Sequence, residues 1–372
     1  ALFIFMVSSL LVAGRVADRF GRRKIFLSGL LLYGAAGIMA GSIPVIWVLI
    51  LARSLQGIAI AMLSPSGLAM SLNEFPPSRR AYALGVWGTI GALTGLCGSP
   101  IAAGMIELFN WQAIFILTGG FSLLILIAGL IVLSDEQEGN NQLPIDWVSA
   151  IIAVMAVGGL TLFLVQGQEW GFSSPVTLLC LCISIISTPL LARRNRTQRH
   201  PLFPPAIFSQ RSFTIGAAGS ALCQVGFFSI YFGLPLYMRE VWSWSPLKIG
   251  FALIPLNVVP LLTAAVAGKI VDRQGPRPMV IFGGVWSGVS FLIIGFFLME
   301  AGYILFALGL LVSGLGAMAI GNNTTIATLL DIEDGLLASA SSASYTARRL
   351  GSALGAVLTA SIVGNRLGSD FK

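Results

Sequence analysis

The sequence contains few charged residues and almost none of the side chains that bind metals or act in nucleophilic catalysis. Only 10% of its 372 residues are Asp, Glu, Lys or Arg, and it has one histidine and four cysteines. Soluble domains carry about 25% charged residues, because their surfaces face water. With 56% hydrophobic residues and a mean hydropathy of +0.88, the composition excludes a water-soluble globular protein. His200 lies in a polar segment, so we expect neither an enzyme active site nor a metal site.

The four cysteines do not form the pattern of a disulfide framework. Cys97, Cys180, Cys182 and Cys223 all fall inside apolar runs. Free cysteine behaves as a small apolar residue, and we therefore expect buried free thiols and neither disulfides nor zinc.

Long apolar runs make up most of the chain. A helix needs about 20 mostly apolar residues to span the hydrocarbon core. The run 1–13 is too short, because 13 residues rise roughly 20 Å, and we expect that the chain starts inside a helix. The sequence thus predicts an all-α polytopic membrane protein whose segments lie near 1–13, 24–41, 44–69, 83–106, 112–133, 147–166, 174–192, 213–237, 247–268, 278–298, 302–328 and 338–364.

The net charge of +7 comes mainly from basic residues in alternate loops. The basic segments 15–24, 79–80, 193–211 and 269–277 share one side of the membrane if every run crosses it. The positive-inside rule makes that side cytoplasmic and places both ends of this chain outside. The basic charge therefore indicates a lipid bilayer as partner and does not indicate nucleic acid.

Two of the basic loops carry the same pattern, Gly-x3-Asp-Arg-x-Gly, at identical spacing. Such parallel repeats are typical of transporters built from two related halves. Short basic loops can also resemble each other by chance, which is the alternative reading. The residues of the two loops are Gly14, Asp18, Arg19 and Gly21 in the first, and Gly268, Asp272, Arg273 and Gly275 in the second.

The first loop continues with Arg22 and Arg23, and as a whole it resembles the signature between the second and third helices of the major facilitator superfamily. Arg53-Ser-Leu-Gln56-Gly57 is similar to the fourth-helix signature of that family. A glycine-rich run resembles the fifth-helix signature of its exporters. The three patterns occur in the family's order, and the residues of the glycine-rich run are Gly91, Gly95, Gly98, Pro100 and Gly104.

The number of runs narrows the resemblance to the fourteen-span drug:proton antiporters of the EmrB/QacA type. The runs 147–166 and 174–192 then form an extra pair between two bundles, and the chain is expected to be truncated at both ends. This resemblance implies an N-terminal bundle at 1–133, an inserted helix pair at 134–192, a cytoplasmic linker at 193–212 and a C-terminal bundle at 213–372.

The resemblance also implies roles for the signature residues. The two loops would act as a conformational lock, although their arginines could serve topology alone. Arg53, Gln56 and Gly57 would take part in proton coupling, because an arginine deep in a span needs a cavity or a partner. The glycines with Pro100 would form an exporter hinge, or only a close packing surface for neighbouring helices.

No Asp or Glu lies in the middle of a predicted span. A proton-driven transporter normally needs a protonatable group in its pathway, and the family supplies an Asp from its first helix. Either a helix outside this sequence holds that group, or coupling works otherwise. Polar and aromatic side chains within the runs are substrate-lining candidates, with interhelical hydrogen bonds as the alternative. They are Trp87, Gln224, Phe228, Tyr231, Asn257, Asn322 and Asn323.

The function that these observations favour is proton-coupled efflux of hydrophobic or cationic small molecules by alternating access. Uptake or exchange of a nutrient on the same fold is the first alternative, and a non-transporting membrane sensor or assembly partner is the second. We expect a small-molecule substrate, H⁺ as the coupling ion and no cofactor. We further expect a multi-pass location in the bacterial cytoplasmic (inner) membrane and an accessory envelope-spanning partner.

Overall fold

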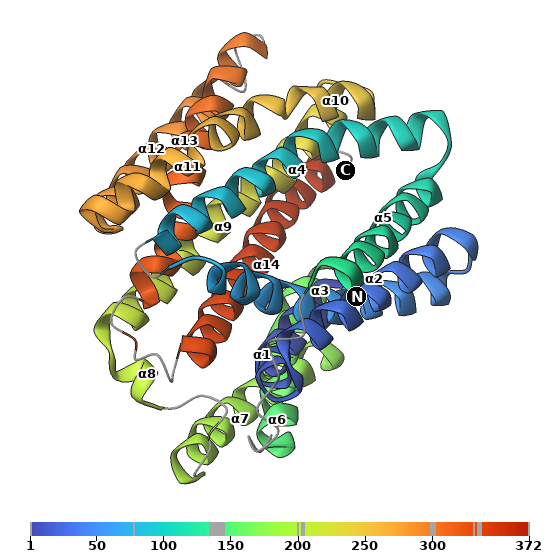
Figure 1. Ribbon diagram of the computed structural model, residues 1–372. Helices are drawn as coiled ribbons and strands as arrows, with labels where there is room; N and C mark the ends of the chain where they lie inside the picture. Colours follow the sequence, from blue (N-terminus) through green and yellow to red (C-terminus); the bar gives the residue numbers. More distant parts are fainter. Residues whose placement is uncertain are drawn as a thin grey trace. The chain divides into compact units, whose positions relative to one another are not determined.

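The computed structural model contains helices throughout the part of the chain that it describes (Figure 1). The described residues are 2–76, 79–133, 146–198, 201, 205–297, 303–329, 332 and 337–370. The helices are α1 (Leu2–Phe20), α2 (Arg22–Ser42), α3 (Ile46–Asn73), α4 (Arg80–Leu108), α5 (Trp111–Val132), α6 (Trp147–Trp170), α7 (Pro175–Thr197), α8 (Pro205–Ser209), α9 (Arg211–Glu240), α10 (Pro246–Ala252), α11 (Ile254–Gln274), α12 (Arg277–Phe297), α13 (Tyr303–Leu329) and α14 (Leu337–Asp370).

The all-α prediction is confirmed. Eleven of the twelve predicted runs coincide with one helix each, and the run 247–268 covers two, α10 and α11. In the part of the chain that the structure describes, ten segments are long and apolar enough to cross a membrane, one of them running from α10 into α11. The predicted runs that form α1 and α14 do not meet this criterion. The last two turns of α1 carry Arg15, Asp18 and Arg19, and α14 is rich in Ser, Ala and Gly and carries Arg348 and Arg349.

The predicted run 247–268 is interrupted, because it forms α10 and α11 with Leu253 between them. Pro255 explains the break, since proline has no N–H to donate to a carbonyl four residues earlier. Ser245 begins α10 by accepting a hydrogen bond from the Lys248 N–H at 3.3 Å. Ser174 caps α7 in the same way, and in both helices a proline follows the cap directly. These are ordinary start signals that the sequence carries locally.

The helices fall into two compact units, each described by itself. Unit one contains residues 1–70, 111–229 and 331–372, and unit two contains residues 71–110 and 230–330. In unit one α2 packs along α5, α6 packs along α7, and α1 contacts α2, α6 and α14. In unit two α4 packs along α11 and α12 along α13. The predicted bundles were defined by the sequence repeat, whereas the two units are defined by the packing of the helices. The predicted bundle boundaries therefore stay a prediction.

Glycines allow the backbones of α2 and α5 to approach closely. A Cβ atom added to Gly37 would lie 2.9 Å from the Gly119 Cα, and one added to Gly119 would lie 2.9 Å from the Gly34 oxygen. The Ser122 hydroxyl donates to the Leu30 carbonyl at 2.9 Å across the same contact. In lipid, contact between apolar helix surfaces gives little free energy of association. Small residues of this kind allow the close van der Waals packing that stabilises the helix pair.

The cysteines are free, as predicted, but the expectation that they are buried is wrong. Cys97 and Cys182 are exposed, and Cys180 and Cys223 are partly exposed. The expectation assumed a protein core around every apolar run. A helix in a bilayer can turn an apolar side chain toward lipid at no cost, and so an apolar run does not predict burial within the protein.

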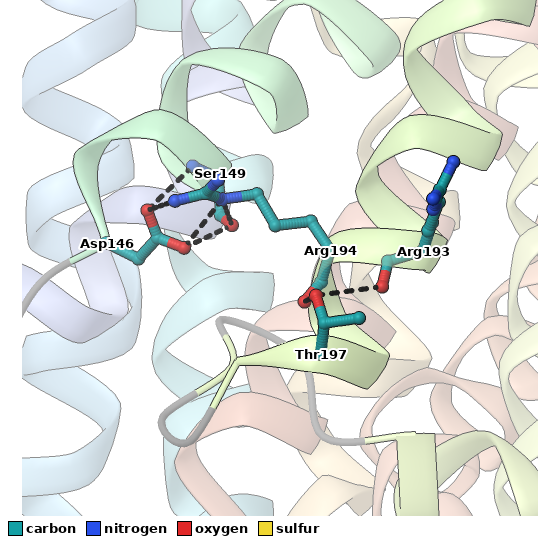
Figure 2. A network of polar contacts seen from close by, with 5 residues as sticks. All are labelled: Asp146, Ser149, Arg193, Arg194 and Thr197. Carbon is teal, nitrogen blue, oxygen red and sulfur yellow. Dashed lines mark hydrogen bonds and ion pairs between the residues drawn. The ribbon is translucent and has the colours of Figure 1, made fainter.

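The helix pair α6–α7 is held at one end by an ion pair (Figure 2). The Arg194 guanidinium on α7 donates to both carboxylate oxygens of Asp146, at 2.9 and 3.0 Å. Asp146 also accepts from the backbone N–H and the hydroxyl of Ser149, at 3.1 and 2.6 Å, and thereby caps α6. The hydrogen bonds from Arg194, more than those from Ser149, lower the pKa of the Asp146 carboxyl to about 2.

We expect Arg194→Gln to loosen this end of the helix pair and to lower the midpoint of thermal unfolding by a few degrees. Arg196→Gln on the same helix is the matched control, because Arg196 is exposed and forms no ion pair with a described residue. Differential scanning fluorimetry of the purified protein would measure both. Because the pKa of Asp146 is lowered by folding, its stabilisation is present above about pH 4 and is lost as the pH falls toward about 2. Equal midpoints for the two variants at pH 7 would contradict the role of the ion pair.

Candidate gating and coupling sites

The two repeated loops have the same backbone geometry. Gly21 links α1 to α2 with φ 95°, and Gly275 ends α11 with φ 78°. Their N–H groups donate to the carbonyls four residues earlier, Ala17 at 3.0 Å and Val271 at 2.8 Å. Positive φ favours glycine, which has no Cβ to clash. The sequence repeat is therefore also a structural repeat of the helix end.

The first loop belongs to a helix that packs against the beginning of α14. A Cβ atom on Gly14 would lie 2.5 Å from the Ser342 hydroxyl and 3.7 Å from the Ser342 Cβ, so this part of α1 lies close to α14. Leu10 and Ala13 pack near Tyr345, one turn further along α14, and the two helices therefore run antiparallel here. Asp18 follows Gly14 by one turn on the same face, which places it level with the start of α14. The side chain of Asp18 lies outside the described residues, and its contact with that helix start stays a prediction.

Other cations of the first loop contact backbone or aromatic groups within unit one. Arg15 donates to the Pro201 carbonyl at 2.7 Å, and Arg23 donates to the Leu130 carbonyl at 3.4 Å. The guanidinium of Arg19 lies 5.4 Å from the centroid of the Phe20 ring, and Arg22 is partly exposed. The arginines of the first loop thus contact α5 and the segment that follows α7. A role as topology signals alone would not require these contacts.

The second loop is more open in unit two. Gly268 is buried, whereas Asp272 and Arg273 are exposed. Lys269 lies over the ring of Tyr82, on α4, with 5.6 Å between the ammonium and the ring centroid. The repeat therefore preserves the helix end but not the environment of its charged side chains.

Gly57 of the predicted coupling motif brings α3 into backbone contact with α1. A Cβ atom there would overlap the Leu2 carbonyl oxygen and would lie 2.9 Å from the Met6 nitrogen. Helix backbone cannot move aside as a flexible side chain can. Gly57 is therefore a packing residue of the α1–α3 contact.

Arg53, the eighth residue of α3, has an aromatic and an amide partner. Its guanidinium carbon lies 4.4 Å from the centroid of the Phe115 ring on α5. Its Nη1 donates to the Gln56 Oε1 at 3.3 Å, and Gln56 is fully buried. Among the described residues no carboxylate pairs with Arg53. An arginine at mid-span costs about 2.5–3.5 kcal/mol on insertion scales, and a desolvated cation–π contact offsets about 2 kcal/mol.

The glycine-rich helix α4 is continuous through Pro100 and packs against α11 in unit two. A Cβ atom on Gly95 would lie 2.6 Å from the Asn257 Oδ1, so the predicted substrate-lining amide faces that glycine. Added Cβ atoms on Gly91 and Gly98 would meet nothing within 4 Å, and one on Gly104 only Leu247 at 4.0 Å. The interpretation of this run as one packed glycine face is wrong for this structure, since only Gly95 is in a tight contact. The hinge role is untested.

The other substrate-lining candidates divide between the units. In unit one Gln224 donates to the Ser352 hydroxyl at 3.4 Å, and Phe228 meets Phe3 edge-to-face with 6.1 Å between centroids. In unit two Tyr231 packs on a buried apolar cluster, and Asn323 donates to the Ala319 carbonyl of its own helix at 2.9 Å. Trp87 is exposed, and the side chain of Asn322 lies outside the described residues. The amides of Gln224 and Asn323 are thus engaged in structural hydrogen bonds.

Two contacts in this region were not predicted from the sequence. Phe115 looked like any aromatic residue of an apolar run, and nothing in its neighbourhood marked it as the partner of Arg53. Gly351 and Gly355 of α14 press against the carbonyls of Ala221 and Val225 on α9, and their four-residue spacing could have revealed them. No cluster of metal-ligating side chains occurs in the part of the chain that the structure describes.

A family model described as Major Facilitator Superfamily matches residues 1–356. The chain belongs to the major facilitator superfamily. This family of membrane transporters accounts for the helical architecture, for the repeated loops and for a function other than enzyme catalysis.

Two curated relatives of the chain are bacterial export proteins. The tetracenomycin C resistance and export protein of Streptomyces glaucescens is 26% identical over 365 residues, which are 98% of this chain and 68% of that protein. The multidrug export protein EmrB of Escherichia coli (strain K12) is 26% identical over 286 residues, which are 76% of this chain and 56% of that protein. The chain thus spans little more than half of EmrB and about two thirds of the Streptomyces protein.

A solved structure of the same superfamily shares the fold. The proton:xylose symporter XylE bound to 6-bromo-6-deoxy-D-glucose aligns with a TM-score of 0.67, over 98% of this chain and 78% of that one, at 16% identity. At this identity the similarity establishes the major facilitator fold and leaves substrate and direction of transport to other evidence.

We expect Gly57→Ala to destabilise the protein by on the order of 1–3 kcal/mol, because the added methyl group meets backbone of α1. Gly120→Ala is the control, since a Cβ atom there would meet nothing within 4 Å and alanine favours the helix. Thermal unfolding of both variants in one detergent would test this. Unfolding of Gly57→Ala at the wild-type temperature would show that the α1–α3 approach is not required.

Proposed function

We propose that the protein exports hydrophobic or cationic small molecules from the cytoplasm, driven by protons that move inward. The observation that supports this most is the family match along residues 1–356, together with relatives that are named as drug and antibiotic exporters. The glycine-rich α4 adds support, because it matches the exporter signature of the family. We place the protein in the bacterial cytoplasmic membrane, as its relatives are bacterial; an accessory envelope-spanning partner stays a prediction.

Alternating access requires a contact that holds one state and can be broken. The packing contact between α1 and α14 is suited to this role, because α1 carries the first copy of the repeated loop and α14 follows the second copy in the sequence. A helix N-terminus carries roughly half a positive charge, and a carboxylate beside it gains on the order of 0.3–1 kcal/mol. Asp18, level with the start of α14, would provide that carboxylate. A contact of this strength stabilises one state without trapping the protein in it.

Proton coupling requires a charge whose environment changes during the cycle. Arg53 is a permanent cation in a membrane helix, and its guanidinium contacts the Gln56 amide and the Phe115 ring, with no carboxylate partner among the described residues. A carboxylate that approaches Arg53 would ionise, and one that leaves it would be protonated. Arg53 would thus couple proton binding to helix movement, whatever element supplies the carboxylate.

Uptake or exchange of a nutrient is the alternative on the same fold. The likeness to a sugar symporter gives it no weight, because the identity of 16% shows fold alone. A membrane sensor, the second alternative, would use large domains outside the membrane, whereas the segments between the described helices are short. Direction of transport therefore distinguishes the remaining candidates.

We expect everted membrane vesicles that contain the protein to take up ethidium when the vesicle interior is acidified. Arg53→Gln should lower this rate to about a tenth or less of wild type, because a neutral side chain cannot favour an ionised carboxylate. Arg196→Gln is the control for a lost surface charge. Acid-driven uptake of probe or metabolite into right-side-out vesicles, with none into everted ones, would replace the export proposal with an importer.

We expect Asp18→Asn to lower the rate of ethidium export severalfold while membrane insertion remains normal. The substitution keeps the size of the side chain and removes the charge that we propose interacts with the α14 N-terminus. Asp272→Asn is the matched variant from the second loop, and its effect should be smaller because Asp272 is exposed. Transport by Asp18→Asn at the wild-type rate would rule out the charge-based lock.

A further inference from the structure

The side chain of Arg53 is half-buried, and few described contacts fix the orientation of its guanidinium. Its one described hydrogen bond, to Gln56, is 3.3 Å long and lies beyond the usual range of about 2.7–3.2 Å. The amide nitrogen of Gln56 is buried and donates to no described group. This long hydrogen bond between neighbours on one helix leaves several guanidinium orientations open, and another group must select one.

Phe115 is the group placed to make that selection. The guanidinium carbon lies 4.4 Å from its ring centroid, well inside the distance of about 6 Å at which an aromatic ring attracts a cation. The ring is itself fixed, because it is 9% exposed and meets Trp111 edge-to-face with 5.8 Å between centroids. Alanines of α2 and α3 surround it and leave room for a planar side chain; they are Ala36, Ala40 and Ala52.

We propose that Phe115 is a positioning residue for proton coupling, whose ring face holds the Arg53 guanidinium beside Gln56. This inference rests on the proposed function, because it assigns Phe115 to the coupling step in which Arg53 acts. The family signature lies on α3 alone, and it does not include this residue of α5. The interaction uses the electron density of the ring, so it depends on ring electronics as well as on shape.

Tyr33 of α2 is a titratable side chain of unit one that lies near enough to Arg53 to act on its charge. A Tyr33→Phe variant removes its hydroxyl and keeps its ring, and so it separates any effect of Tyr33 from that of Phe115.

The test replaces Phe115 with phenylalanines that carry one, two or three ring fluorines. Fluorine withdraws electron density from the ring face and nearly preserves its shape, so the series changes ring electronics while the packing of the side chain is kept. We expect ethidium export driven by a pH gradient to fall stepwise, by about threefold to tenfold over the series. The KM for ethidium should stay within twofold of wild type, since Phe115 acts on Arg53 and not on the substrate.

Three control series show whether the fall in export depends on the contact between the Phe115 ring and Arg53. The stepwise fall should vanish in the Arg53→Gln background, persist in the Tyr33→Phe background, and be absent when the same residues replace Phe121, an exposed position of α5. Equal rates across the Phe115 series, in a protein that exports ethidium in response to a pH gradient, would overturn the role of Phe115 alone. Absence of gradient-driven export in the wild-type protein would overturn the proposed function, and with it the coupling role.

Discussion

A bilayer offers the backbone no hydrogen-bond partners, and this constraint shapes every element of the structure. Each long apolar run must satisfy its own N–H and C=O groups, which a helix does within the segment. The exceptions lie where a helix ends, and there the chain uses specific residues. Gly21 and Gly275 close helices at positive φ, and Ser174, Ser245 and Asp146 cap others.

Helices whose backbone N–H and C=O groups are already paired gain little free energy from apolar contact in lipid. Their association therefore depends on close approach of their backbones. Glycines provide this at several contacts, among them Gly37 with Gly119 between α2 and α5 and Gly57 with the backbone of α1. At these positions any Cβ atom would meet backbone, which cannot yield.

The charged residues with described contacts include an ion pair at the helix ends and an arginine within a predicted span. Asp146 and Arg194 pair at the ends of α6 and α7, where water screens them and the carboxylate is capped by Ser149. Arg53 lies deeper and has no acidic partner among the described residues. Its guanidinium contacts the ring face of Phe115 and the side-chain amide of Gln56 instead. A charge held in this incomplete way responds strongly to an approaching carboxylate, which is the property that a proton-coupled step requires.

The sequence by itself determined the helices, the membrane class, the repeat and the family, because these depend on local composition and on spacing along one chain. It also indicated Arg53 and Gln56, which are one helical turn apart. The tertiary structure alone decided that Phe115 covers Arg53, that Gly14 meets Ser342 and that Gly95 rather than Gly91 is tightly packed. These contacts depend on the rotation and depth of one helix against another, and an apolar run in lipid carries no polar face from which that rotation could be predicted.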